Sequence, residues 1–114
     1  MLPAIYNPTI KQGVPFRRQL IITDAAGTPA NLTGATVVAE LRDTAGALLA
    51  TMVCTVTTPL AGEIELLIAS TSGLPETDGQ HSHPYDVFVT PATGDRFCPI
   101  QGQACVEAKT TELA

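Results

Sequence analysis

Hydrophobic and polar positions alternate along most of this chain, and nowhere does a helical period persist for three turns. Residues 63–68 show the pattern well, since Ile64, Leu66 and Ile68 share one parity while Glu63 and Glu65 take the other. Strict alternation over a few residues is typical of a half-buried β-strand. The pattern predicts strands at residues 9–11, 16–23, 35–42, 48–57, 63–68, 84–90 and 96–107.

Turn-forming residues separate most of these runs, at intervals of about ten residues that are typical of a sandwich or barrel. We therefore expect an all-β fold, an immunoglobulin-like antiparallel β-sandwich of about seven strands that forms a single domain over residues 1–114. Residues 69–75 are the one place where we expect a helical turn. Residues 76–83 are polar and predict an exposed loop.

Composition narrows the classes of function. The chain is 45% hydrophobic and 15% charged, which excludes an intrinsically disordered protein. Its formal charge is −5, with only six Lys and Arg residues. Binding to phosphates or to an anionic membrane surface depends on clustered basic residues, so we expect neither a nucleic-acid partner nor a membrane partner. No segment predicts a membrane-spanning helix or a signal peptide, and we expect synthesis in a cytoplasm.

No arrangement of residues in the sequence indicates an enzyme active site. The glycines at 13, 27, 34, 46, 62, 73, 79, 94 and 102 never form Gly-x-Gly, so phosphate-binding loops are not indicated. The cysteines, Cys54, Cys98 and Cys105, are odd in number and lack Cys-x-x-Cys spacing, which favours reduced, buried thiols. A catalytic triad would have to use one of the two histidines, both in the predicted loop. We expect no catalytic activity and no cofactor.

Two polar patterns each leave an alternative open. In extended backbone His81 and His83 point the same way and could share a metal ion, with Asp78 or Asp86 as an oxygen ligand. The alternative is a solvated loop with incidental histidines. Glu63 and Glu65 could similarly bind Ca²⁺ or act as an acid and base, or could simply line a solvated strand face that blocks edge-to-edge aggregation.

Apolar residues near the start of the chain are the candidates for contact with a partner. Leu2, Ile5 and Tyr6 precede the first predicted strand, so residues 1–8 are either an added strand that completes the sandwich or a docking arm laid on a neighbour. Tyr85 and Phe88 fall on opposite faces of one strand, which places one in the core and leaves the other for a partner. Residues 109–114 read as a polar tail.

Several segments share a pattern of strands and turns with a known family. They are Ile10-Lys11-Gln12-Gly13, Phe16-Arg17, residues 20–29 and 31–37, Leu41-Arg42 before Gly46, Pro84-Tyr85-Asp86-Val87 and residues 100–104. Together these segments resemble the N-terminal domain of bacteriophage baseplate upper proteins and related small phage β-sandwich proteins. The resemblance covers nearly the whole chain and departs from the family pattern at residues 74–83. It implies a structural role in the virion after synthesis in the host bacterial cytoplasm, with no catalytic residues.

The sequence thus leads to a non-enzymatic phage structural protein that docks onto other virion subunits, as a component of the tail, the baseplate or the fibre attachment. A capsid cement protein that stabilises the head shell is the alternative within this class, and a carbohydrate-binding module is the alternative from another. The expected partners are tail, baseplate or major capsid subunits, with homo-oligomerisation in the particle. Docking also predicts an exposed apolar patch of several hundred Å².

Overall fold

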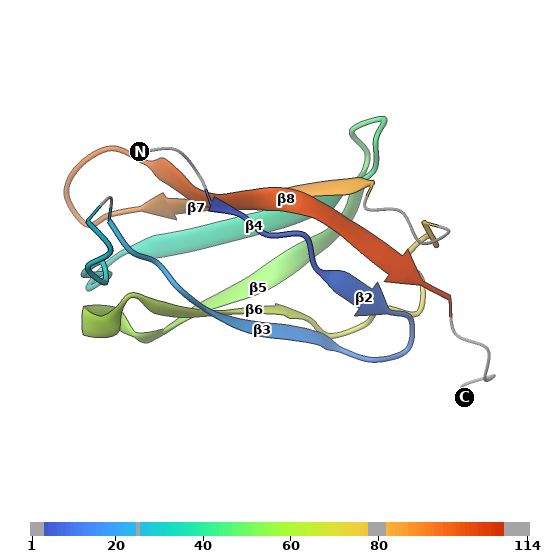
Figure 1. Ribbon diagram of the computed structural model, residues 1–114, viewed down its shortest axis with the longest axis horizontal. Helices are drawn as coiled ribbons and strands as arrows, with labels where there is room; N and C mark the ends of the chain where they lie inside the picture. Colours follow the sequence, from blue (N-terminus) through green and yellow to red (C-terminus); the bar gives the residue numbers. More distant parts are fainter. Residues whose placement is uncertain (1–3, 25, 78–81, 109–114) are drawn as a thin grey trace.

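The computed structural model describes residues 4–24, 26–77 and 82–108, and nearly all of its regular structure is β-strand. The all-β class is therefore confirmed (Figure 1). The elements are β1 Ala4–Ile5, β2 Thr9–Lys11, β3 Phe16–Ile21, β4 Thr36–Arg42, β5 Leu48–Thr58, the 3₁₀ helix η1 Pro59–Ala61, β6 Glu63–Ile68, β7 His83–Thr90 and β8 Phe97–Glu107.

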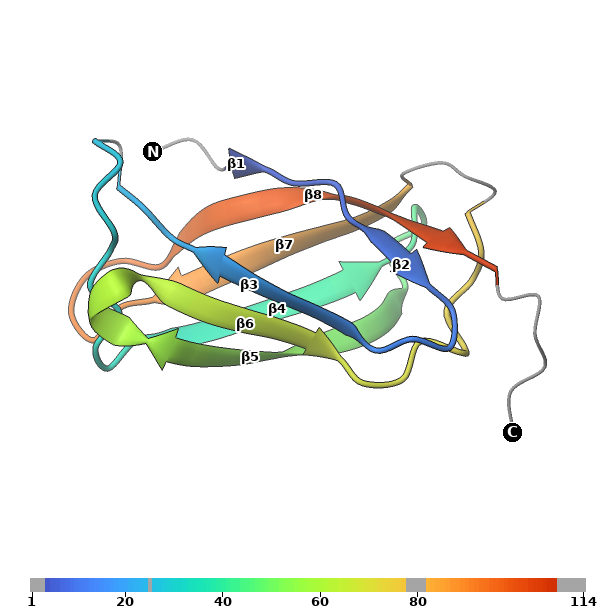
Figure 2. The same ribbon diagram turned by 60° about the horizontal axis from the view of Figure 1, so that its bottom comes forward.

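One continuous sheet curls into two layers, in the order β3–β6–β5–β4–β7–β8–β1, with β2 also pairing with β8. The curl is possible because β5 belongs to both layers. Its first half pairs with β4, where Met52 lies opposite Ala39, and its second half pairs with β6, where Val53 lies opposite Leu67. Figure 2 shows β3, β6 and β5 in front of β4, β7 and β8.

The core lies between these layers and follows the predicted alternation. Leu41 on β4, Ile64 on β6 and Val87 on β7 are completely buried, while their strand neighbours face outward. The alternation of residues 48–57 predicts that Leu48 faces inward together with Met52, and for Leu48 this prediction is wrong. Leu48 is exposed, because the β4–β5 register shifts after Leu41 and turns the start of β5 over.

Prediction and structure differ in how the N-terminal strands run. β1 and β2 pair with β8 in parallel, Ala4 opposite Ile100 and Ile10 opposite Val106, so the sheet is mixed rather than wholly antiparallel. The described part of the N-terminal segment is thus a strand of the chain's own fold. Between β1 and β2 the contact continues, because Asn7 Oδ1 accepts a 2.9 Å hydrogen bond from the Gln103 amide.

Residues 69–77 close one end of the sandwich as an irregular plug, not as the helical turn we expected. Thr71 is buried, and its hydroxyl both accepts and donates a hydrogen bond. It accepts from the Gly13 amide at 3.0 Å and donates to the Val14 carbonyl oxygen at 2.9 Å. Leu74 and Thr77 are also buried, and the Thr77 amide donates to the Val106 carbonyl at 3.1 Å. The plug therefore joins the β2–β3 turn to β8.

Candidate functional site

Four outward apolar side chains stand on the neighbouring strands β7, β4, β5 and β6, in two cross-strand pairs. Val38 lies opposite Phe88 of β7, and Val53 lies opposite Leu67 of β6. The pairing of β4 with β5 ends at Ala39 and Met52, so Val38 and Val53 lie one residue beyond it, where β5 leaves β4 and pairs with β6. Val38 is 50% exposed and Val53 58% exposed, while Phe88 and Leu67 are half-buried. We call Phe88, Val38, Val53 and Leu67 the apolar row.

A second row of side chains runs beside the apolar row. It lies two residues after Val38 on β4 and two residues before Phe88 on the antiparallel strand β7. Glu40 lies opposite Asp86, Asp86 lies opposite Gln101, and Gln101 lies opposite Ile5 of β1. On the β5 side, Glu40 also lies opposite Thr51. We call Ile5, Gln101, Asp86, Glu40 and Thr51 the polar row. Because a strand rises by about 3.3 Å per residue, the two rows are about 7 Å apart.

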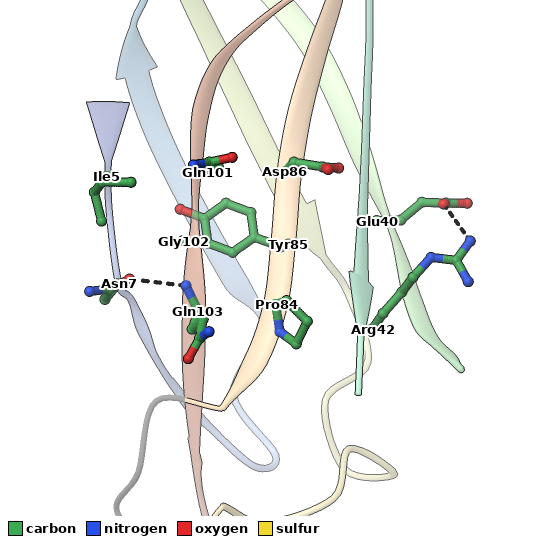
Figure 3. A pocket seen from close by; sticks show the side chains of 10 residues that line it. All are labelled: Ile5, Asn7, Glu40, Arg42, Pro84, Tyr85, Asp86, Gln101, Gly102 and Gln103. Carbon is green, nitrogen blue, oxygen red and sulfur yellow. Dashed lines mark hydrogen bonds and ion pairs between the residues drawn. The ribbon is translucent and has the colours of Figure 1, made fainter. Parts of the chain in front are cut away.

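A shallow groove of about 640 Å³ lies over the polar row, except for Thr51 (Figure 3). Its lining comes from four strands and the segment after β1, and consists of Ile5, Asn7, Glu40, Arg42, Pro84, Tyr85, Asp86, Gln101, Gly102 and Gln103. One guanidinium shares the groove with two carboxylates. Arg42 Nη2 lies 2.8 Å from Glu40 Oε1, and Arg42 Nη1 donates to the Gly46 carbonyl oxygen at 2.9 Å.

The charges of the groove do not balance. Glu40 has Arg42 as a partner, but no cation of the described residues lies within ion-pair distance of Asp86. Figure 3 shows the Asp86 carboxylate between Gln101 and Glu40 in the polar row. Chemically, the groove offers amide and carboxylate oxygens with one excess negative charge, which suits a positively charged or hydrogen-bonding group better than an anion.

Under the groove, two tyrosines and an arginine tie the N-terminal segment to both layers. Tyr85 Oη donates a 2.6 Å hydrogen bond to the Tyr6 carbonyl oxygen, and Arg18 Nε of β3 donates to Tyr6 Oη at 2.9 Å. Burial, and then the nearby Tyr6, raise the pKa of Tyr85 well above its usual range. Arg18 Cζ also lies 4.6 Å from the centroid of the Phe16 ring.

Of the three apolar residues proposed from the sequence for partner contact, the structure describes Ile5 and Tyr6. Leu2 lies outside the described residues. Ile5 is exposed at the edge of the groove, whereas Tyr6 is half-buried by contacts within its own chain. The assignment of Tyr85 and Phe88 to opposite faces is confirmed, with Tyr85 in the core and Phe88 outside.

His83 does not lie in an exposed loop, which corrects the sequence prediction. It is the first residue of β7, only 7% exposed, and its Nε2 lies 2.9 Å from the Pro75 carbonyl oxygen. Because a carbonyl only accepts, Nε2 carries the proton, and Nδ1 is buried without a partner among the described residues. His81, and Asp78 with it, lie outside the described residues. Within the described ranges, no three His, Cys, Asp or Glu side chains gather as a metal site.

The other candidate groups take part in local contacts. Glu63 Oε1 accepts from Thr57 Oγ1 at 2.9 Å, and Glu65 lies 3.9 Å from Arg17 Nε. Cys54, Cys98 and Cys105 are free thiols, as predicted, but only Cys105 is buried, whereas Cys54 and Cys98 are half-buried. Burial raises the pKa of Cys54 to about 11, so this thiol is a poor nucleophile at neutral pH.

Sequence reasoning missed the apolar row as a site, although a signal was present. The alternation of residues 35–42 places Val38 with Glu40 on the outward face, and β-branched residues there have no core to fill. The pattern could not show that Val38 lies opposite Phe88, because the order of strands in a sheet cannot be inferred from any single strand.

Comparison with known proteins adds no assignment. No protein-family model matches the chain, and no curated protein matches it in sequence. Across the part of the chain that the structure describes, no helix has the length and apolar character required to cross a membrane.

Proposed function

We propose that this chain is a non-enzymatic bacteriophage structural protein that docks onto other virion subunits in the tail, baseplate or fibre attachment. The observation that carries the docking function is the apolar row. Its exposed valines stand on regular strands, Val38 on β4 between β7 and β5, and Val53 on β5 beside β6. The assignment to a phage particle rests on the resemblance of the sequence segments to baseplate upper proteins.

A face of this kind suits protein contact for energetic reasons. Burying apolar surface contributes roughly 25 cal/mol per Å², and the central part of an interface is depleted in charge and ringed by polar groups. Here the apolar row is flanked by the polar row along β4 and β7. Because the strands are rigid, little ordering entropy opposes the contact.

The carbohydrate-binding alternative has less support. Sugar recognition uses exposed aromatic rings as stacking surfaces, but Tyr85 is only 5% exposed and Tyr6 is held by Arg18. The groove supplies amides and carboxylates without an exposed ring of either tyrosine. Cement and tail roles would use the same face and differ in the partner.

Co-sedimentation with purified phage tails and with empty head shells tests the proposal. The docking face is disabled by Val38→Lys, and Ile21→Lys is the matched control, since Ile21 is 60% exposed on the separate strand β3. We expect tails to bind the wild-type chain and the control but not the Val38 variant. Binding to shells alone would favour the cement role, and binding to neither particle would reject the proposal.

A further inference from the structure

The two rows together indicate what kind of partner this face accepts. We propose that it binds an extended segment or strand of another protein that presents an apolar side chain and, two positions along, a lysine or arginine. The apolar side chain lies on Val38 and Phe88, and the cation lies over Asp86 and Glu40. This inference rests on the docking function proposed above and specifies the chemistry of the partner.

The positive charge is inferred from a repulsion within the sheet. Glu40 and Asp86 lie directly opposite each other on neighbouring strands, an arrangement that is destabilising for like charges. Arg42 offsets the charge of Glu40, and no described cation lies within ion-pair distance of Asp86. A partner ammonium or guanidinium over the groove would remove this repulsion.

The spacing of the two rows gives the pattern in the partner. Val38 and Glu40 are two residues apart on β4, and Phe88 and Asp86 are two residues apart on β7. In any extended segment, residues i and i+2 also lie on one face, about 7 Å apart. A segment aligned with β4 and β7 therefore places its apolar and basic side chains over the two rows at once.

A second copy of the chain fits this face poorly. Two-fold association brings the same surface together, so it would add a second pair of carboxylates to the first. The formal charge of −5 per chain opposes such pairing further. Charge complementarity thus favours a different, basic partner.

Cyclic β-hairpin peptides provide a defined probe. Three peptides share one backbone and carry on one face Val and Lys, Val and Glu, or Ser and Lys at positions i and i+2. Each is titrated into ¹⁵N-labelled protein at low salt while the backbone amide signals are followed. We expect the Val/Lys hairpin to shift the signals of Val38, Asp86 and Phe88, and to bind at least about tenfold more tightly than the other two.

Matched variants separate the two contributions. Asp86→Asn should weaken binding of the Val/Lys hairpin about two- to fivefold, the range expected of a partly exposed ion pair, and should reduce its salt dependence. Asp95→Asn, which removes a carboxylate from the exposed β7–β8 loop, should change neither. Val38→Ser should weaken binding, whereas Ile21→Ser on β3 should not.

Three results would overturn the inference: equal binding of the Val/Glu and Val/Lys hairpins, equal affinities of the Asp86 and Asp95 variants, or a self-association abolished by Val38→Lys. Shifts of the same signals by oligosaccharides but by no hairpin would also reject it. Its failure can be told apart from failure of the proposed function. If phage tails bind through Val38 but no hairpin does, only this inference fails; if the hairpin binds but no particle does, only the virion role fails.

Discussion

The phenol of Tyr85 on β7 donates a 2.6 Å hydrogen bond to the backbone carbonyl oxygen of Tyr6, 79 residues earlier in the chain. The bond passes beneath β8 and fixes the N-terminal segment from the inside of the sandwich. Removing only the hydroxyl, by Tyr85→Phe, should lower the free energy of unfolding by about 0.5–1.5 kcal/mol. Urea denaturation measures this loss, and hydrogen exchange at the Tyr6 amide should accelerate with it. An unchanged exchange rate would show that backbone pairing alone holds the segment.

Gly102 makes room for the same segment. A Cβ at this position would clash with the carbonyl oxygen of Tyr6, which is backbone and cannot swing away. We expect Gly102→Ala to displace the segment and to destabilise the fold by about 1–3 kcal/mol. Gly73→Ala is the control, because a Cβ there meets nothing within 4 Å. Equal denaturation midpoints for the two variants would contradict this account of β8.

The plug depends on one hydroxyl. Thr71→Val keeps the shape of the side chain but leaves the Gly13 amide and the Val14 carbonyl oxygen without their partner. Buried groups left unpaired cost about 1–3 kcal/mol, and we expect a loss of that size in thermal or urea unfolding. Thr55→Val changes the same group at an exposed position of β5 and should be close to neutral. A neutral Thr71 variant would mean that water replaces these bonds.

Stability should fall in alkaline solution, with Cys54 responsible for the first part. In the unfolded chain its thiol ionises near the ordinary value of 9.0, whereas burial raises the folded pKa to about 11. Between these values the folded state holds the extra proton, so raising the pH favours unfolding. Above pH 10 the raised pKa of Tyr85 lowers the stability of the folded state in the same way. Urea titrations from pH 8 to pH 10 should show a smaller decline for Cys54→Val than for the wild-type chain; parallel curves would exclude Cys54 as the cause.

The acidic pair on the outer face should cost stability when no partner is bound. Asp86→Asn removes the repulsion with Glu40 and should stabilise the isolated chain by a few tenths of a kcal/mol, about 0.2–1 at most. Differential scanning calorimetry at low salt measures the change, which 0.5 M salt should reduce. Asp95→Asn is again the control. A destabilised Asp86 variant would show that the carboxylate serves the fold rather than the surface.

Local patterns were sufficient for most of the fold but not for its closure. The alternation in β4, β6 and β7 predicted which residues are buried, because each strand has one dry face. The direction of β2 could not be predicted, since Thr9-Ile10-Lys11 alternates identically in a parallel or an antiparallel pair. Gly102 carried a hint, as a glycine inside a strand often marks close backbone approach, but nothing near it in sequence identifies Tyr6.

The candidate site shows a similar division. The alternation of β7 predicted that one of Tyr85 and Phe88 lies in the core and the other outside, and the structure places Phe88 outside, in the apolar row. His83 was assigned to a solvated loop because its neighbours in sequence are polar. It is buried because residues from other segments of the chain, Pro75 and Ala104 among them, lie next to it in the fold. The polarity of a segment reports only on residues that are close in sequence, whereas burial depends on residues that are close in space.

The parallel pairing of β1 and β2 with β8 has a mechanical consequence. Tension applied to the Ala4 end of β1 and the Glu107 end of β8 pulls two parallel strands in opposite directions along their length (Figure 2). The bonds from Tyr6 to Gln101, from Cys105 to Pro8 and from Gln12 to Glu107 are then loaded in shear, all together. A subunit anchored at both of these ends would resist the load until all of these bonds break together, rather than losing them one after another.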